Sequence, residues 1–307
     1  MKKVDIVILG GGPAGIAAAI WCKRLGINHL LLEEREELGG QLKQIKNIVM
    51  DYPGLNNMVG KDLERQFLTH LDELNCHYDT RITLGDINAD SQTLTYLKDD
   101  STNLIHYQFL IVATGASPRR LGIPGESEML QRNEIYSASV DAYRFEGKHV
   151  AVVGGGDRAL EGALLLSDHG VNVTLIHRSE RFRARMELME PALQRENITV
   201  LTNHRVKEIM GVDRVSSIRI EDEQGGSNNV DVSAVLVRIG VQPNSDFLKH
   251  IVELDAEGHI VTDSFGVSSR SSICAIGDVC TKPFYSSIST STGQAMTLVK
   301  HLSTYLH

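Results

Sequence analysis

The residues with the most evident chemistry form a glycine-rich run near the start of the chain. The apolar, β-branched segment Val4–Leu9 leads directly into the sequence GGGPAG, which has the pattern G-x-G-x-x-G. In this pattern the first glycine makes a tight turn, the second lets the backbone approach a diphosphate, and the third lets the helix pack on the strand. The following helix presents its unpaired N–H groups to the phosphates. The candidate binding residues here are Gly10, Gly12, Pro13, Ala14 and Gly15.

A second strand and an acidic residue complete this pattern. The segment His29–Leu32 is expected to form the next strand, and Glu33 follows it directly. A carboxylate at this place can accept hydrogen bonds from the ribose hydroxyls of an adenosine. Because strand, glycines, helix, strand and acid occur in one register, they predict a dinucleotide-binding unit and not a purely structural turn.

The same pattern occurs again further along the chain. A strand expected over His149–Val153 leads into GGGDRA, which has the form G-x-G-x-x-A, and a helix over Leu160–Asp168 and a strand over Val171–Ile176 follow. The repeat predicts a second nucleotide site, with a scaffold that binds nothing as the alternative. Its candidate residues are Gly154, Gly156, Asp157, Arg158, Ala159, His177, Arg178, Arg183 and Arg238.

The charge at the end of this second unit indicates which nucleotide it holds. Its second strand ends at His177-Arg178 where an acid would select NAD, and an arginine there can bind the 2′-phosphate of NADP. NADPH is therefore favoured over NADH. The alternative for the arginine-rich stretch 178–185 is a solvated helix face of alternating charge.

Bulk composition restricts the classes of function. The chain has 307 residues, 42% of them hydrophobic and 23% charged, which suits a globular protein of two domains. A net charge of −8 without a basic stripe argues against nucleic acid as a partner. No run approaches the ~18 apolar residues of a membrane span, and Met1 leads directly into the first strand. A cytoplasmic protein is expected, without membrane association and without a metal site.

Further segments complete the interpretation of the chain as an α/β protein. An amphipathic helix is expected over Lys61–Leu74, a buried strand over Phe109–Val112 and a closing helix over Ile288–Tyr305. Short strands are expected over Cys76–Ile82, Thr93–Leu97, Gly258–Val261 and Ile273–Ile276, with several more between Thr199 and Val237. Turn-rich crossings occur at 116–125 and 240–244. The fold expected is two Rossmann-like three-layer nucleotide-binding domains, with the second (117–243) inserted into the first (1–116 and 244–307).

Together these motifs resemble the two-domain FAD/NAD(P) flavoprotein family, in its thioredoxin-reductase-like branch. The shared motifs are GGGPAG, Glu33, GGQL, DYPG, ATGASPR, a second GGGD-x-A, HR-x(4)-RA, IG-x-x-PN and AIGDV. The resemblance implies that the first domain (1–116 and 244–307) binds FAD, that the second binds a pyridine nucleotide, and that the protein is a homodimer. The FAD residues it implies, beyond those of the glycine run, are Glu33, Gly40, Gln41, Ala113, Thr114, Gly115, Gly277 and Asp278.

The chain departs from this family at the position of its redox chemistry. Thioredoxin reductases carry C-x-x-C before the second nucleotide strand, and Ser137 and Val140 stand in place of both cysteines. Neither side chain can form a disulfide, so the ordinary thioredoxin-reductase mechanism is excluded. Asp141 remains where the family has its acid, and is expected to cap the next segment. Ser286 replaces a glutamine that the family places by the flavin ring.

The four cysteines, Cys22, Cys76, Cys274 and Cys280, form no C-x-x-C. Cys280 follows Asp278 closely, as in ferredoxin–NADP reductases of the thioredoxin-reductase-like type. A Cys274–Cys280 redox pair is one option, and free buried thiols are the other. No catalytic residue is assigned; Asp141 and Cys280 remain the candidates.

These observations favour an FAD-dependent oxidoreductase that moves electrons between NADPH and a carrier, without an active-site dithiol. Ferredoxin, flavodoxin and a small quinone-like molecule are the carriers considered, because a flavin can exchange electron pairs and single electrons. One alternative is a flavoenzyme independent of NAD(P)H, with a second FAD or another ligand in the second site. The sequence support for it is Arg158, Ser179 and Arg238, since arginines there could meet a larger anion. The other alternative is a non-catalytic flavin-binding sensor module.

Overall fold

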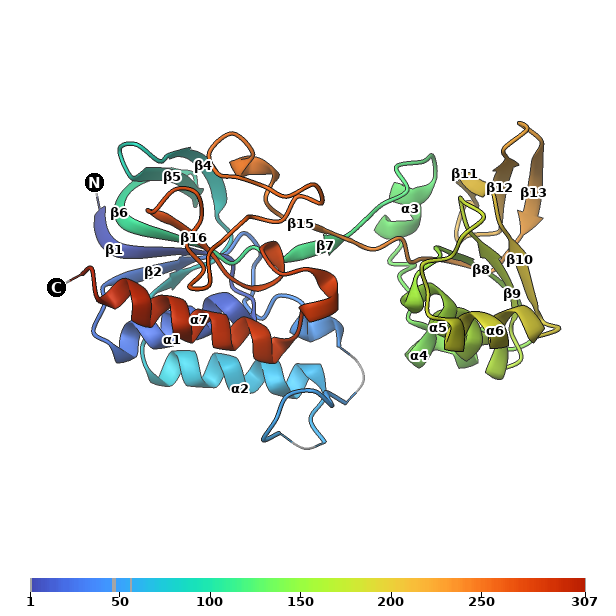
Figure 1. Cartoon of the computed structure of the whole chain (residues 1–307), viewed down its shortest axis with the longest axis horizontal. Helices are drawn as coiled ribbons and strands as arrows, with labels where there is room; N and C mark the ends of the chain where they lie inside the picture. Colours follow the sequence, from blue (N-terminus) through green and yellow to red (C-terminus); the bar gives the residue numbers. More distant parts are fainter. Residues whose placement is uncertain (1, 46–47, 56, 307) are drawn as a thin grey trace. The chain divides into compact units, whose positions relative to one another are not determined.

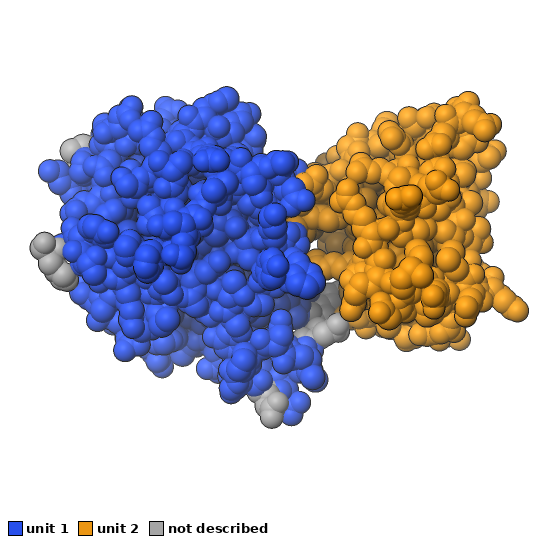
Figure 2. Space-filling view, viewed as in Figure 1, with its two compact units in different colours: residues 1–117, 242–307 blue, residues 118–241 orange. Residues whose placement is uncertain are grey.

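The computed structural model describes residues 2–45, 48–55 and 57–306. The chain divides into two compact units, coloured separately in Figure 2: Met1–Ser117 with Gln242–His307, and Pro118–Val241. These boundaries differ by one or two residues from the expected ones. Within the described residues, no helix is long and apolar enough to cross a membrane.

The first unit is built around a mixed sheet with the strand order β3-β2-β1-β6-β5-β4 (Figure 1). Strand β6 is long because it belongs to both the parallel and the antiparallel part of this sheet. Its second half pairs in parallel with β1 and β16, while its first half pairs with β5 in antiparallel orientation. Strand β4 was not expected from the sequence. The strands are β1 (Lys2–Leu9), β2 (His29–Leu32), β3 (Tyr78–Asp79), β4 (Thr83–Asn88), β5 (Thr93–Lys98), β6 (Ser101–Val112) and β16 (Ile273–Ala275).

Two hydrophobic clusters on opposite faces of this sheet make the unit three layers deep. On one face Ile6 and Ile8 pack with residues of helices α1 (Pro13–Arg24), α2 (Gly60–Glu73) and α7 (Ile288–Ser303). On the other face Val7 and Leu9 pack with Leu94 of β5 and with the segment 248–260. The alternation along β1 follows from the two-residue period of a strand, which turns successive side chains to opposite faces.

The second unit repeats this architecture with a parallel sheet of order β10-β9-β8-β14. Helices α5 and α6 belong to the cluster on one face, and an antiparallel sheet, β11-β12-β13, packs on the other. The strands are β8 (His149–Val153), β9 (Asn172–Ile176), β10 (Ile198–Leu201), β11 (His204–Met210), β12 (Ser217–Asp222), β13 (Ser227–Asp231) and β14 (Ala234–Val237). The helices are α3 (Glu126–Gln131), α4 (Ala138–Asp141), α5 (Asp157–Asp168) and α6 (Met186–Gln194). The expected fold of two Rossmann-like three-layer domains is confirmed.

Several local expectations were wrong. The turn expected at 241–244 contains strand β15 (Val241–Pro243), which pairs with β7 (Ala116–Pro118). The strand expected over Gly258–Val261 is reduced to an isolated bridge at Ile260. The stretch 178–185 is irregular and not a helix face, since α6 begins only at Met186. Short 3-10 helices lie at Leu42–Gln44, Ala142–Phe145, Asp246–Leu248, Gly277–Val279 and Pro283–Tyr285.

Candidate dinucleotide sites

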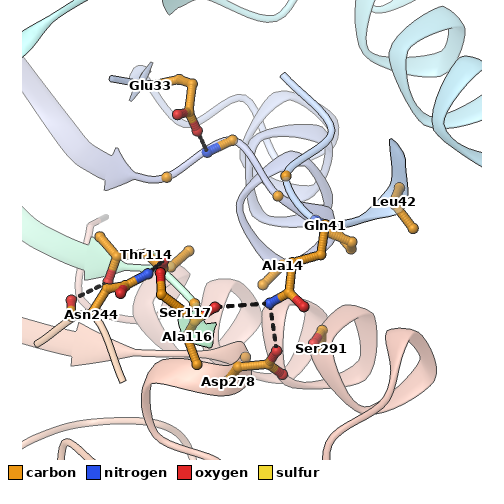
Figure 3. A pocket seen from close by; sticks show the side chains of 18 of the residues that line it. Ala14, Glu33, Gln41, Leu42, Thr114, Ala116, Ser117, Asn244, Asp278 and Ser291 are labelled. Atoms are coloured by element: carbon orange, nitrogen blue, oxygen red, sulfur yellow. Dashed lines mark hydrogen bonds between the residues drawn. The ribbon is translucent and has the colours of Figure 1, made fainter. Parts of the chain in front are cut away.

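A cavity of about 990 Å³ lies at the carboxyl ends of the parallel strands of the first unit (Figure 3). This volume is at the upper end of the range for small-molecule and cofactor sites. Of the thirteen FAD residues expected from sequence, all but Gly15 line it: Gly10, Gly12, Pro13, Ala14, Glu33, Gly40, Gln41, Ala113, Thr114, Gly115, Gly277 and Asp278. Residues from five separate stretches of the chain therefore meet around one cavity.

Each of the three glycines of the first fingerprint is explained by a different physical constraint. Gly10 has φ +103°, and a Cβ there would lie 2.4 Å from the carbonyl oxygen of Ala113. A Cβ on Gly15 would lie 1.8 Å from the carbonyl oxygen of Gly10, so this glycine permits helix and strand to pack. Gly12 has φ −78°, and the nearest atom to a Cβ there is the Gly40 Cα at 4.0 Å. The fold itself does not require glycine at 12, and the open space before it can admit a ligand.

Glu33 is held in place by two backbone donors. Its Oε2 accepts a hydrogen bond from the Gly11 N–H at 2.6 Å, and its Oε1 accepts one from the Arg35 N–H at 2.9 Å. The side chain is buried at the wall of the cavity. Each carboxylate oxygen has a further lone pair, so the group can still accept a hydroxyl of a ligand.

A polar cluster closes the other end of the cavity. Gln41 donates through Nε2 to Asp278 Oδ2 at 3.2 Å and to the Ala116 carbonyl oxygen at 3.1 Å, and Figure 3 shows the amide between these two acceptors. The Ser286 hydroxyl donates to Asp278 Oδ1. The Gln41–Asp278 bond joins residues 237 positions apart in the chain, and together the bonds hold Asp278 as a fixed acceptor at the cavity wall.

Two features of the cavity were missed by the sequence reasoning. Asn244 bonds the Thr114 carbonyl oxygen through Nδ2 at 2.8 Å, and its own carbonyl accepts the Thr114 hydroxyl at 2.7 Å. The signal was available, because Asn244 ends the IG-x-x-PN motif. An apolar wall also went unnoticed, since its residues have no shared periodicity; it consists of Leu42, Ile45, Ile48, Val49, Met50, Ile82 and Leu84.

The second fingerprint has the same division among its glycines. A Cβ on Gly154 would lie 2.2 Å from the Arg238 carbonyl oxygen, whereas a Cβ on Gly156 would meet nothing within 4 Å. The ring of His177 lies against Gly155, as the Glu33 side chain lies against Gly11 in the first unit. Gly156 is thus a glycine although the packing of the second unit would admit a side chain there. A glycine at this position is explained by a ligand that approaches the backbone, which argues against a scaffold that binds nothing.

The charged residues expected around this fingerprint are not equivalent. The Asp157 carboxylate is bound by Arg185, through its Nε and its backbone N–H, both at 2.9 Å. Arg178 and Arg183 are exposed, and neither has an ion pair with any described residue. The guanidinium groups of Arg178 and Arg183 are therefore available to bind an anion near the end of β9. The fingerprint acid Asp157 already has Arg185 as its partner.

Arg158 and Arg238 are the other two arginines expected around the second fingerprint. Arg158 is exposed on the first turn of α5, next to the packed Ala159. Arg238 is half-buried and donates to the carbonyl oxygens of Val237 at 3.0 Å and Tyr136 at 2.7 Å. Burial, with a smaller effect from the charge of Arg158, lowers the pKa of Arg238.

Asp141 does not cap the segment that follows it, so this expectation was wrong. Its Oδ2 accepts a hydrogen bond from the Ser137 N–H at 2.8 Å, which caps the start of its own short helix, α4. The Ser137 and Ser139 hydroxyls lie 3.0 Å apart. The segment that aligns with C-x-x-C is thus held by local polar contacts that need no sulfur.

The cysteines give no support to a redox pair. Cys274 is fully buried in the hydrophobic cluster on the helical face of the sheet, and Cys280 packs against the cluster on the opposite face. Neither lines the cavity, and all four thiols are free. Burial raises the pKa of Cys274 to about 12 and that of Cys280 to about 11, so both thiols are protonated at neutral pH.

This burial predicts slow alkylation of Cys280 in the native chain. With a pKa of about 11, its thiolate fraction at pH 8 is roughly 100-fold below that of an ordinary cysteine. Iodoacetamide labelling, read by peptide mass spectrometry, is expected to accelerate about ten-fold per pH unit between 7 and 10 and to start far below the rate in denaturant. Rapid labelling of native Cys280 at pH 7 would contradict the burial and reopen a redox role for this thiol.

Most of the chain matches one protein family. Residues 4–297 match the model of the pyridine nucleotide-disulphide oxidoreductases. The chain belongs to this family. Within it, the chain lies in the thioredoxin-reductase-like branch.

Individual relatives support the same placement. The chain is 34% identical to a thioredoxin reductase of Mycolicibacterium smegmatis over 90% of this chain and 88% of the relative. It is 30% identical to a component of the alkyl hydroperoxide reductase of Staphylococcus aureus over 91% of this chain, and it spans only 54% of that longer protein. The crystal structure of Lactococcus lactis thioredoxin reductase superposes with a TM-score of 0.78 and 29% identity, covering 99% of both chains.

Proposed function

We propose that this protein is an FAD-dependent oxidoreductase that moves electrons between NADPH and a carrier such as ferredoxin or flavodoxin, without an active-site dithiol. The observation that carries the proposal is the pair of fingerprints, each with one glycine whose Cβ position is open (Gly12 and Gly156). The protein would act as a cytoplasmic homodimer.

The first unit has the groups that FAD needs. Gly12 and the N-terminal N–H groups of α1 would receive the diphosphate, and Glu33 would accept the adenosine ribose hydroxyls. Asp278, held by Gln41 and Ser286, would accept a hydroxyl of the ribityl chain. FAD, when bound, supplies the exchange of a hydride with the nicotinamide and of electrons with the carrier. The chain contributes the binding, the orientation and an apolar wall that limits water.

The second unit has the groups that NADPH needs. Gly156 and the N-terminus of α5 would receive the diphosphate, and Arg178 and Arg183 would bind the 2′-phosphate. His177, stacked on Phe182 with ring centroids 4.9 Å apart, takes the place where an acid would repel that phosphate. The exposed arginines therefore favour NADPH over NADH.

The absence of a dithiol determines the kind of acceptor. Ser137 and Val140 replace the two cysteines, and the described cysteines lie outside the cavity. A disulfide substrate handled through an internal dithiol is therefore not part of the proposal. A carrier that takes electrons directly at the flavin edge needs no thiol, and this chemistry suits ferredoxin or flavodoxin.

The purified protein is expected to be reduced by NADPH. It should contain one FAD per chain, whose visible absorbance is bleached within seconds by stoichiometric NADPH under anaerobic conditions and more slowly by NADH. The expectation follows from the two exposed arginines near the 2′-phosphate position. Stopped-flow spectroscopy measures both rates. A flavin that stays oxidised for minutes with both nucleotides would refute the pyridine-nucleotide part of the proposal.

A second candidate has one specific observation in its favour. The positive charge of Arg158 contributes to the lowered pKa of Arg238, and in the described chain neither guanidinium has an ion pair with a carboxylate. Such a pair would also suit the diphosphate of a second FAD, in a flavoenzyme that does not use NAD(P)H. A flavin-to-protein ratio near two after desalting would favour this candidate, and a ratio near one would exclude it.

A further inference from the structure

Two arginines lie around the second fingerprint, one on helix α5 and one at the end of strand β14. Arg158 lies in the first turn of α5, one residue after Asp157 begins the helix. Arg238 directly follows β14, and its N–H donates to the Val153 carbonyl oxygen at 2.7 Å. Because β14 and β8 are parallel neighbours, this bond places the Arg238 backbone beside Gly154, where a Cβ would lie 2.2 Å from its oxygen.

The pair carries positive charge without a counterion in the described chain. The guanidinium of half-buried Arg238 is satisfied by two carbonyl oxygens and by no carboxylate. The closest acid in the fingerprint, Asp157, is bound by Arg185. Burial and the neighbouring charge of Arg158 both disfavour the charged form of Arg238, as its lowered pKa reflects. An anion placed between the two arginines would remove this penalty.

The surroundings of the pair fit a diphosphate. The Cβ position of Gly156 is open and the first N–H groups of α5 face the same end of the sheet. An arginine offers a planar fork of donors that matches phosphate oxygens, in charge-assisted bonds about twice as strong as neutral ones. Arg178 and Arg183 follow β9, on the opposite side of β8 in the strand order. Arg238, which follows β14, and the Arg178/Arg183 pair therefore lie on opposite sides of strand β8.

We propose that Arg158 and Arg238 bind the diphosphate of the dinucleotide held by the second unit. They set the affinity for any dinucleotide there and leave the choice between NADPH and NADH to Arg178 and Arg183. This inference rests on the proposed function, because it requires a dinucleotide in that unit. NADPH, NADH and FAD share the ADP diphosphate, and ADP-ribose is the smallest probe that carries it.

The test is calorimetric titration of the FAD-loaded protein with ADP-ribose, NAD⁺ and NADP⁺ at one ionic strength, since the oxidised nucleotides carry the same diphosphate and do not reduce the flavin. Arg158→Gln is expected to raise the Kd of all three about ten-fold, the loss of one charge-assisted contact. The matched control, Arg178→Gln, is expected to raise only the Kd of NADP⁺. Because Arg238 also holds the Tyr136 carbonyl, Arg238→Lys is the milder variant, and it should weaken all three ligands by a smaller common factor.

The outcomes distinguish the proposed dinucleotide site in the second unit from the proposed role of Arg158 and Arg238 within it. If the wild-type protein holds one FAD and binds none of the three ligands, the second unit is not a dinucleotide site and both fall. If it binds them and Arg158→Gln leaves every Kd unchanged, or changes that of NADP⁺ alone, only the arginine inference is overturned. If the wild-type protein holds two flavins, a fall toward one in Arg158→Gln supports the diphosphate contact with FAD as the ligand, and an unchanged ratio overturns it.

Discussion

Replacing Gly12 by valine is expected to give a folded protein that purifies without FAD. The negative φ of Gly12 (−78°) suits an L side chain, and a Cβ there meets no atom closer than 4.0 Å, so the fold should tolerate the change. The added side chain would occupy the space proposed for the diphosphate. Loss of two charge-assisted contacts there corresponds to about 3–6 kcal/mol, or a 10²- to 10⁴-fold weaker affinity for FAD.

Flavin content and thermal unfolding together measure this effect. Flavin per chain is read from absorbance after desalting, and the Tm of the variant is compared with that of the wild-type protein stripped of flavin. Gly15→Val is the contrasting variant, because a Cβ at 15 would lie 1.8 Å from the Gly10 carbonyl oxygen and should destabilise the fold itself. A Gly12→Val protein that keeps a full complement of FAD would show that the open space does not receive the diphosphate.

Replacing Gly156 by valine is expected to separate flavin binding from flavin reduction. The variant should keep one FAD per chain, because Gly156 lies in the second unit and the described residues that line the cavity all belong to the first. Bleaching by NADPH at low concentration should slow at least 100-fold, since a Cβ that meets nothing within 4 Å in the structure would stand where the second diphosphate is proposed.

Stopped-flow reduction by dithionite serves as the control for Gly156→Val. Dithionite needs no nucleotide site, so its rate should match that of the wild-type protein. Unchanged reduction of this variant by NADPH would contradict a nucleotide site at the second fingerprint. Gly12→Val is thus expected to lose the flavin, whereas Gly156→Val is expected to keep the flavin and lose its reduction by NADPH.

The architecture could be predicted from sequence because it depends on local patterns. The run Val4–Leu9 before GGGPAG, and its repeat at His149–Val153, each combine a strand, a turn and a helix within a few residues. The missed elements show the limit of such reasoning. Strand β4 is polar and partly exposed, and is stabilised by pairing with β5. Helix α6 contains Pro191, which weakens any helical signal.

The sequence predicted which fingerprint residues gather at the cavity, but it did not predict the hydrogen bonds between their side chains. The sequence placed Gln41 and Asp278 beside one ligand, but their direct hydrogen bond depends on how β16 pairs with β6. From the sequence, Cys274 and Cys280 could have formed a redox pair. In the structure they belong to hydrophobic clusters on opposite faces of the sheet. Closeness along the chain did not predict closeness in space there, because successive elements turned the two side chains to different faces.

What the sequence by itself determined is the pair of βαβ units with glycine fingerprints and the lack of C-x-x-C spacing among the four cysteines, since both follow from residue types at fixed local spacing. The tertiary structure decided which of these residues remain free to act. It bound Asp157 to Arg185, left Arg158 and Arg238 without a carboxylate in the described chain, and showed that Gly12 and Gly156 face open space. The physical reason is that availability depends on every neighbour a group meets, and those neighbours come from strands and loops that only the folded sheet brings together.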